Sequence, residues 1–282
     1  MGAQPRHLTL GHSPDPDDAF MFYGLAAGKI ETNGWEFEHI LADIQTLNER
    51  ALRGELDITA ISFHAYPWVA EHYALTKCGA SVGDGYGPIV VARTPMQPDD
   101  LRGKLIAVPG KQTTAFLALT LLLGRESFRP ETVMFDEIPA QVAGGRADAG
   151  LLIHEGQLTY GRMDLHKIVD LGQWWKTITD MPLPLGGNCI RRSLGRAAMA
   201  EITSILGRSI EYGLANREAA LAHAGKFGRG LTNELTNRFV GLYVNHWTQD
   251  LGDTGRRAVA ELLRRGNEAG LVPEIERIDF VG

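Results

Sequence analysis

Short apolar runs alternate with amphipathic stretches along the first part of the chain. Apolar residues that alternate with polar ones indicate strands, and apolar residues three or four positions apart indicate helices. The predicted strands cover residues 7–11, 36–40, 56–62 and 88–93, and the predicted helices cover residues 19–27, 43–52 and 63–73. Strands that alternate with helices predict a parallel sheet whose loops gather at one edge.

The same pattern begins again near residue 105. Strands are predicted at residues 106–108, 133–135, 151–153 and 167–171, and helices at residues 115–123 and 138–148. The remaining helices are predicted at residues 197–213, 217–226, 232–244 and 254–269. Because 282 residues exceed one usual domain, we expect two lobes. Residues 1–91 and 190–282 form the first lobe with the C-terminal helices, and residues 92–189 form a second lobe inserted between two crossing segments.

Composition and charge narrow the class of protein. Hydrophobic residues make up 44% of the chain and charged residues 22%, as in ordinary soluble domains. The formal net charge is −6 and Lys and Arg form no run longer than a pair, so neither nucleic acid nor a membrane is an expected partner. The apolar run 115–123 is too short to span a bilayer. The N-terminal residues lack the apolar run of a secretory signal, which favours a cytoplasmic protein.

Two further patterns argue against common cofactor sites. Cys78 and Cys189 are the only cysteines, and neither has partners at metal-ligand spacing. The glycine-dense loop 79–87 has neither the Walker nor the dinucleotide-binding spacing. The sequence therefore predicts neither a zinc site nor a disulfide framework, and it offers no nucleotide-binding motif.

Polar side chains stand where predicted strands give way to predicted helices. Ser13, Ser62 and the pair Thr113-Thr114 occupy three comparable turns. The first N–H groups of a helix and the positive end of its dipole attract anions, and a hydroxyl at the N-cap can also turn to a ligand. Capping of the helix alone is the commoner use of such residues. Their shared position nevertheless makes them candidate ligand contacts.

The end of the predicted strand 151–153 carries the strongest candidate for chemistry. His154 follows this strand at the carboxyl edge, where open α/β sheets bind ligands. Histidine is the side chain that titrates near neutral pH. The stretch 142–154 also repeats the outline of residues 52–62, so that His154 in one lobe corresponds to Ser62 in the other. A histidine near an apolar run is more often a hydrogen-bonded structural residue than a catalyst, but these features make His154 the strongest candidate for chemistry.

Two neighbouring features have both structural and functional interpretations. Trp174 and Trp175 could stack on a flat ligand, although packing of the second lobe is the commoner use of such bulk. Glu155 would point away from His154 if the strand continued through it, which favours structural pairing over catalysis.

Seven segments, in this order and spread over nearly the whole chain, resemble the 1,4-dihydroxy-6-naphthoate synthase family of the futalosine route to menaquinone. They are HSPDPDDAFMFYGL, DIQTLNERAL, ITAISFHAY, PGKQTTAFLAL, ADAGLLIHEGQLTY, VDLGQWW and PLPLGGN. The resemblance implies an α/β, two-lobed type 2 periplasmic-binding-protein-like fold, with a cleft between the lobes and a helical C-terminal tail. Such a fold encloses a small ligand by hinge motion. The family is cytoplasmic and uses neither metal nor organic cofactor.

The resemblance also implies a reaction and its residues. The family is a lyase that converts cyclic dehypoxanthinylfutalosine to 1,4-dihydroxy-6-naphthoate and releases the sugar-derived fragment. Its catalytic histidine matches His154, and its substrate contacts match Ala60-Ile61-Ser62 and Thr113-Thr114. The implied partner is a small molecule with a carboxylate and a sugar-derived ring. At the opening motif this chain has Ser13-Pro-Asp-Pro-Asp-Asp18, where the family often shows a Cys and an Asn.

Other functions are compatible with the same fold. A solute-binding protein of a transporter shares it without catalysis, and would carry a signal peptide or a lipid-anchor cysteine near its start. Chorismate dehydratase shares both fold and pathway, but the IHE and PGKQTTA segments favour the synthase. An effector domain of a regulator would follow a DNA-binding helix-turn-helix with a basic face.

Overall fold

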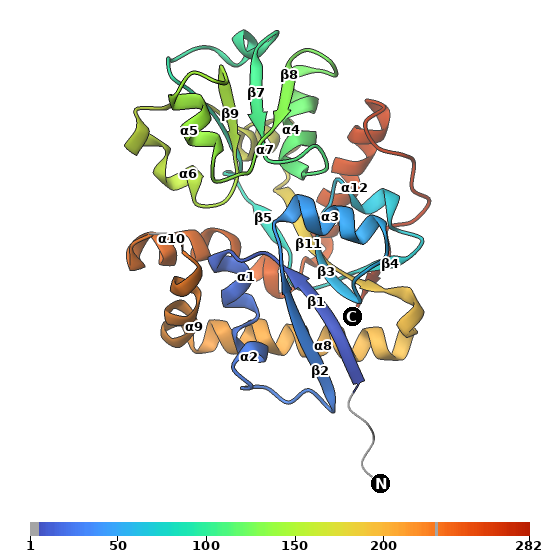
Figure 1. Cartoon of the computed structure of the whole chain (residues 1–282). Coiled ribbons are helices and arrows are strands. Elements are labelled where there is room, and N and C mark those ends of the chain that lie inside the picture. The colour runs from blue at the N-terminus through green and yellow to red at the C-terminus, as the bar shows by residue number, and fades with distance from the viewer. Residues whose placement is uncertain (1–5, 229–230) are drawn as a thin grey trace. The chain divides into compact units, whose positions relative to one another are not determined.

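The computed structural model describes residues 6–228 and 231–282. The chain divides into two compact units, each with its own sheet (Figure 1). Unit 1 comprises Met1–Ser81, Gly186–Arg256 and Ile275–Gly282, and unit 2 comprises Val82–Leu185 and Arg257–Glu274. The sequence pattern instead places the crossings near residues 92 and 189 and assigns the whole C-terminal segment to the first lobe.

The sheet of unit 1 is mixed. Its strand order is β12-β4-β11-β3-β1-β2, and β5 pairs with β11 outside this path. The strands are β1 (Arg6–His12), β2 (Trp35–Leu41), β3 (Ile58–Ser62), β4 (Tyr73–Thr76), β5 (Ser81–Gly83), β11 (Leu183–Arg191) and β12 (Phe280–Val281). β1 is parallel to β2 and β3, as the sequence predicts, whereas β11 is antiparallel to both β3 and β4. The expectation of a purely parallel sheet is therefore wrong for the returning segment.

Helices around this sheet build the larger core. The helical elements of unit 1 are α1 (Pro16–Met21), α2 (Tyr23–Ala26), α3 (Ile44–Leu52), η1 (Tyr66–Trp68), η4 (Arg192–Leu194), α8 (Arg196–Ala215), α9 (Arg217–Ala224), η5 (Gly225–Phe227), α10 (Asn233–Tyr243) and α11 (His246–Gln249). Helix α12 (Gly252–Glu268) begins in unit 1, but its residues from Arg257 onwards belong to unit 2. Leu10 of β1, Phe20 of α1 and Ile205 of α8 meet in one fully buried cluster. Burying a side chain of this size stabilises the fold by about 1.5–3 kcal/mol.

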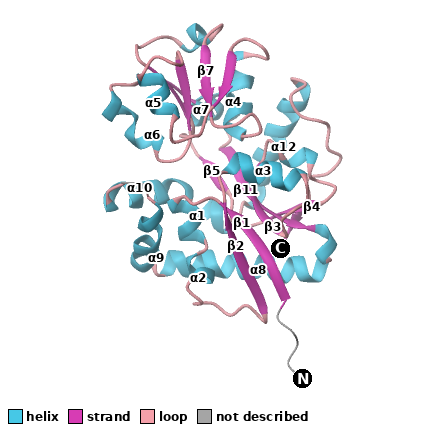
Figure 2. Cartoon of the chain, in the orientation of Figure 1, coloured by secondary structure: helices cyan, strands magenta, loops and turns pink. Residues whose placement is uncertain are grey.

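Unit 2 has a five-stranded sheet of order β10-β6-β9-β7-β8. Figure 2 draws its strands in magenta and labels β7 among them. Its strands are β6 (Ile89–Ala92), β7 (Leu105–Val108), β8 (Arg129–Thr132), β9 (Ala149–Leu152) and β10 (His166–Asp170). Its helical elements are η2 (Pro98–Leu101), α4 (Thr114–Leu123), α5 (Ile138–Ala143), α6 (Gly156–Thr159), η3 (Tyr160–Met163) and α7 (Leu171–Thr179). β7 is parallel to β8 and β9, so these three strands share one carboxyl edge.

The helix predicted at residues 63–73 does not form. Only η1 is helical there, and Tyr73 begins β4, where it pairs with Arg191 of β11. Pro67 cannot donate a backbone hydrogen bond, which prevents a continuous helix. The residues after η1 instead form β4, because they pair with β11, a strand that lies much later in the sequence.

Two other predicted elements are displaced. The strand expected at residues 133–135 lies instead at β8, whose residues are mostly exposed. Because β8 is an edge strand, it needs no apolar alternation and tolerates Pro130. The helix expected at residues 19–27 is divided into α1 and α2 at Phe22, a fully packed residue.

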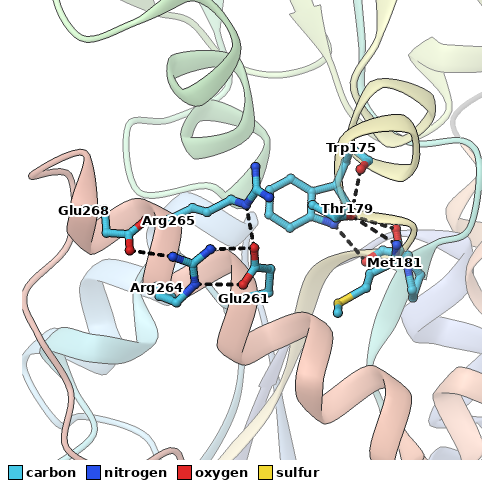
Figure 3. Close-up of polar contacts among 8 residues, drawn as sticks. Trp175, Thr179, Met181, Glu261, Arg264, Arg265 and Glu268 are labelled. Atoms are coloured by element: carbon cyan, nitrogen blue, oxygen red, sulfur yellow. Dashed lines mark hydrogen bonds and ion pairs between the residues drawn. The ribbon is translucent and has the colours of Figure 1, made fainter.

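Trp175 is a packing residue of unit 2 (Figure 3). Its side chain is fully buried, and Nε1 donates to the carbonyl oxygen of Pro182 at 3.2 Å. The Arg265 guanidinium lies 5.6 Å from the ring centroid. Glu261 accepts hydrogen bonds from Arg264 at 2.8 Å and from Arg265 at 2.6 Å, and the second bond holds the Arg265 guanidinium beside the Trp175 ring.

In the described residues, no helix combines the length and apolar character needed to cross a membrane.

Candidate active site

In unit 1, two predicted serines lie at the carboxyl ends of parallel strands. Ser13 directly follows β1, and Ser62 is the last residue of β3. Because β1 and β3 pair in parallel, both serines occupy the same edge of the sheet. Ser13 is 6% exposed and Ser62 is 3% exposed. The sequence prediction that polar residues gather at this edge therefore agrees with their positions in unit 1.

Ser62 is held by Asn48 of α3. The backbone N–H of Ser62 donates to Asn48 Oδ1 at 2.9 Å, and Asn48 Nδ2 donates to Ser62 Oγ at 3.0 Å. The backbone N–H can only donate, so the amide orientation of Asn48 is determined. Ser62 Oγ consequently accepts from Asn48, and its own proton must point in another direction.

The two residues before Ser62 are mainly structural. Ile61 is fully buried and Ala60 is 9% exposed. β11 pairs with this stretch through Gly187, opposite Ile61, and Asn188, opposite Ala60. A ligand could therefore contact these two residues only through their backbone atoms and the Ala60 methyl group.

Hydrogen bonds fix the backbone of Ser13 at both of its polar groups. Its N–H donates to Asp18 Oδ2 at 2.7 Å, and its carbonyl oxygen lies 3.0 Å from His12 Nδ1. The next residues, Asp15 as N-cap and Pro16 in the first turn, open helix α1. Hydrogen bonds to the Asp18 carboxylate and to the His12 imidazole thus hold the Ser13–Asp18 turn.

His12 forms a hydrogen-bonded pair with His39 of β2. The Nε2 of His12 and the Nδ1 of His39 are 2.9 Å apart. Burial lowers the pKa of His12 to about 4, although the hydrogen bond to Ser13 and the charge of Asp15 oppose this shift. Burial also lowers the pKa of His39 to about 4, and His12 and His223 add to that effect. The pair is therefore uncharged at neutral pH.

In unit 2, Thr113 and Thr114 lie at the start of α4. Thr113 is the N-cap: Oγ1 accepts from the N–H of Phe116 at 3.2 Å and donates to the carbonyl oxygen of Gly110 at 2.8 Å. Both threonines are 2% exposed. The capping function considered from the sequence is present, and the helix N-terminus that it stabilises is a favourable environment for negative charge.

His154 follows the end of β9 in an unusual backbone conformation. Its φ is 57°, and α6 begins two residues later at Gly156. A left-handed conformation costs an L-residue about 1–2 kcal/mol, and such strain is concentrated at functional sites. The imidazole packs edge-on against Phe135, with 4.6 Å between ring centroids and 63° between planes. Because β9 ends at Leu152, Glu155 is not a strand residue and the alternation argument for its direction fails.

Each unit thus collects its candidate residues at one edge. Unit 1 carries Ser13 and the 60–62 stretch, and unit 2 carries the Thr113-Thr114 turn and His154, since β7 and β9 are parallel. Within residues 6–228 and 231–282, no group of three or more His, Cys, Asp or Glu side chains is arranged to hold a metal ion.

Sequence reasoning missed Asn48, His12 and Phe135. Asn48 falls among the apolar positions of α3, and His12 continues the buried alternation of β1, so both are polar residues at core positions. That violation of the hydrophobic pattern was the available signal. Phe135 gave no such signal, because it lies in an irregular segment after β8.

Comparison with solved structures identifies the fold. A crystal structure of an Archaeoglobus fulgidus protein is 42% identical, with a TM-score of 0.90, and the match covers 94% of this chain and 98% of that chain. The alkanesulfonate-binding protein of Xanthomonas axonopodis pv. citri, solved with MOPS, is 13% identical with a TM-score of 0.76, covering 97% and 96%. A Candida albicans protein described as having the generic periplasmic-binding-protein fold is 12% identical with a TM-score of 0.71, covering 96% and 92%. The predicted periplasmic-binding-protein-like α/β fold is confirmed.

Comparison with known sequences identifies the family. A family model described as menaquinone biosynthesis matches residues 8–268. A Thermus thermophilus protein named 1,4-dihydroxy-6-naphthoate synthase is 41% identical, and the match covers 97% of this chain and 99% of the relative. A Streptomyces coelicolor protein of the same name is 36% identical, covering 95% of each. The chain belongs to the menaquinone-biosynthesis family, and the resemblance read from its sequence motifs is confirmed.

Proposed function

We propose that the chain is a carbon–carbon lyase that converts cyclic dehypoxanthinylfutalosine to 1,4-dihydroxy-6-naphthoate and releases the sugar-derived fragment. Membership of the menaquinone-biosynthesis family and the names of two relatives support this activity. The observation that carries the proposal is the strained, left-handed His154 at the carboxyl edge of unit 2.

His154 is the proposed general base. A neutral imidazole can remove a proton from a hydroxyl or an acidic carbon of the substrate, and general acid–base catalysis of this kind contributes about 10²- to 10⁴-fold. The electron pair left behind forms a new double bond while the adjacent carbon–carbon bond breaks, and the pair of the broken bond passes to the other carbon, which takes up the returned proton. The reaction is redox-neutral, and the aromatic ring of the product supplies driving force. Phe135, edge-on to the imidazole, limits the directions in which that ring can turn.

Ser62 is the proposed contact for a hydroxyl of the sugar-derived ring. Asn48 donates to Ser62 Oγ, so the serine proton is directed away from Asn48. That proton can be donated to a substrate oxygen. Ser13, Ala60 and Ile61 are proposed as further contacts of unit 1, the last two through their backbone and Cβ surfaces.

The start of α4 is the proposed site for the substrate carboxylate. Thr113 uses its hydroxyl to cap the helix, so its contribution is to stabilise the helix end rather than to bind by its side chain alone. The N-terminal N–H groups and the positive end of the dipole favour a carboxylate near Thr113 and Thr114. Neither the proposed hydrogen bond from Ser62 nor the proposed carboxylate site at α4 requires a metal or an organic cofactor.

We also propose that the enzyme acts in the cytoplasm on a small-molecule substrate. Cys78 and Cys189 are both buried and form no disulfide with each other, which is compatible with a reducing compartment. A biosynthetic activity on a small-molecule substrate is consistent with the same location.

The direct test is incubation of the purified protein with cyclic dehypoxanthinylfutalosine, followed by detection of the naphthoate by mass spectrometry. Product formation is expected; a folded sample that yields none would contradict the proposal. Parallel incubation with chorismate tests the dehydratase that shares the fold, and no consumption of chorismate is expected.

The test of the base is His154→Gln. We expect kcat to fall by about 10²- to 10⁴-fold while substrate is still bound, because the proton acceptor is lost and the shape is nearly kept. His166→Gln is the matched control, since His166 is exposed on β10 of the same unit. Near-normal turnover by the His154 variant would show that another group removes the proton.

A further inference from the structure

A hydrogen-bonded pair of histidines, of which His12 is buried and His39 is partly buried, lies next to the Ser13–Asp18 turn, and the proposed reaction does not use it. His12 is the last residue of β1 and is 5% exposed, and His39 lies on the neighbouring β2. The His12 ring is 5.1 Å from the His39 ring and 4.7 Å from the Phe22 ring, measured between centroids. Packing by Phe22 and pairing with His39 therefore confine the His12 imidazole from two directions.

The neighbours of this pair determine where its protons are. The carbonyl oxygen of Ser13 only accepts, so the His12 Nδ1 that lies 3.0 Å away must carry a proton. Nε2 of neutral His12 is then bare and accepts a hydrogen bond. His39 Nδ1, 2.9 Å from that nitrogen, must be the donor. Both rings consequently adopt the Nδ1–H tautomer, which is the less common form of free histidine in water.

We propose that His39 is a positioning residue for substrate binding: its Nδ1–H holds the His12 ring so that His12 donates to the Ser13 carbonyl and fixes the Ser13–Asp18 turn. The inference rests on the proposed function, in which Ser13 contacts the substrate. With Asp18 accepting from the Ser13 N–H at 2.7 Å, both polar groups of the Ser13 backbone are held. His39 acts on substrate only through this chain of hydrogen bonds.

Protonation limits the pH range in which the arrangement persists. Asp15 favours a proton on His12, whereas His223 of α9 disfavours a proton on either ring. Asp18 lies on the far side of Ser13, where it accepts from the backbone. One added proton still permits an N–H between the two rings, but a second places two N–H groups against each other. Since burial opposes even the first charge, the turn is fixed at neutral pH and loosens in acid.

Two variants of His39 separate hydrogen bonding from packing. His39→Phe keeps an aromatic ring but removes the donor, and we expect KM to rise about 3- to 10-fold with kcat unchanged, the size expected for one lost internal hydrogen bond. His39→Asn places an amide nitrogen where Nδ1 lies, and its KM should return close to that of the wild type. His7→Phe is the matched control, because His7 lies on β1 with a side chain that is 72% exposed. A wild-type KM for His39→Phe would overturn the proposal.

Two measurements on the intact protein decide the inference without relying on turnover. Long-range ¹⁵N–¹H NMR of histidine-labelled protein should show the Nδ1–H tautomer for the His12 and His39 rings at neutral pH. The His39 signal disappears in His39→Phe. Hydrogen exchange at the Ser13 amide should be faster in His39→Phe than in His39→Asn. Absence of naphthoate from the wild type would refute the proposed function alone, whereas an Nε2–H tautomer or unchanged exchange would refute the role of His39.

Discussion

Asn48 and Ser62 exchange two hydrogen bonds, and their directions fix the proton of the Ser62 hydroxyl. Asn48 Oδ1 accepts from the Ser62 N–H, which leaves Nδ2 as the donor to Oγ. A serine that already accepts from a buried amide is available as a donor to a ligand. His154 is fixed by different means, namely a left-handed backbone and an aromatic neighbour. At the scale of single residues, the candidate site therefore consists of side chains whose orientation is set by a second residue.

Substitution of Asn48 should separate binding from folding. In Asn48→Asp the carboxylate still accepts from the Ser62 N–H, but it also attracts the serine hydroxyl proton, so we expect KM to rise about 3- to 10-fold. In Asn48→Ala both hydrogen bonds are lost, and the free energy of unfolding should fall by about 1–3 kcal/mol. Steady-state kinetics and urea unfolding of both variants provide the measurements. An unchanged KM in Asn48→Asp would mean that the Ser62 proton does not reach the substrate.

The polar residues at strand ends were predictable, whereas their partners were not. Ser13, Ser62 and His154 each follow an apolar strand, and this pattern is local in the sequence. Asn48 contacts Ser62 from 14 positions away, and Phe135 contacts His154 from an irregular segment. The left-handed conformation of His154 depends on how the chain leaves β9, which no residue pattern at this position encodes.

At the scale of elements, long amphipathic helices and central strands follow from the sequence because their periodicity is strong. β4, β5 and β12 were missed, since strands of four, three and two residues are too short to show alternation. β11 was also missed although it has nine residues and lies inside the sheet, because Pro184, Gly186 and Gly187 interrupt its apolar pattern. β8 was displaced because an edge strand has few apolar positions. Pairing with distant strands decides these elements, so local patterns carry little information about them.

Helix α4 should depend on the Thr113 hydroxyl. Thr113→Ala removes the acceptor for the Phe116 N–H and the donor to the Gly110 carbonyl, and we expect the free energy of unfolding to fall by about 1 kcal/mol. Thr113→Ser keeps the hydroxyl and is the matched control, with most of the stability retained. Urea unfolding of the two variants at neutral pH measures the difference. Equal stability of Thr113→Ala and the wild type would mean that α4 is held by packing alone.

At the scale of the whole molecule, each unit has its own sheet and its own buried cluster. The chain passes between the units after Ser81, Leu185, Arg256 and Glu274. The assignment of residues 257–274 to unit 2 depends on contacts such as Arg265 with Trp175, whose partners are far apart in sequence. Helical periodicity reveals that the C-terminal helix exists but not which sheet it accompanies.

The stability of the whole molecule should decline in acid because folding lowers the pKa of both His12 and His39. Folding lowers the pKa of His12 and of His39 from 6.5 to about 4, so in this window the unfolded chain binds more protons than the folded chain. The free energy of unfolding is therefore highest above pH 6.5 and falls as the pH drops towards 4, by at most about 1.4 kcal/mol per pH unit for each histidine. Urea unfolding between about pH 5 and pH 6.5 measures this slope. His39→Asn removes one of the histidines whose pKa folding lowers, so its slope should be shallower than that of the wild type. Equal slopes for the wild type and His39→Asn would show that His39 is protonated in the folded protein as readily as in the unfolded chain.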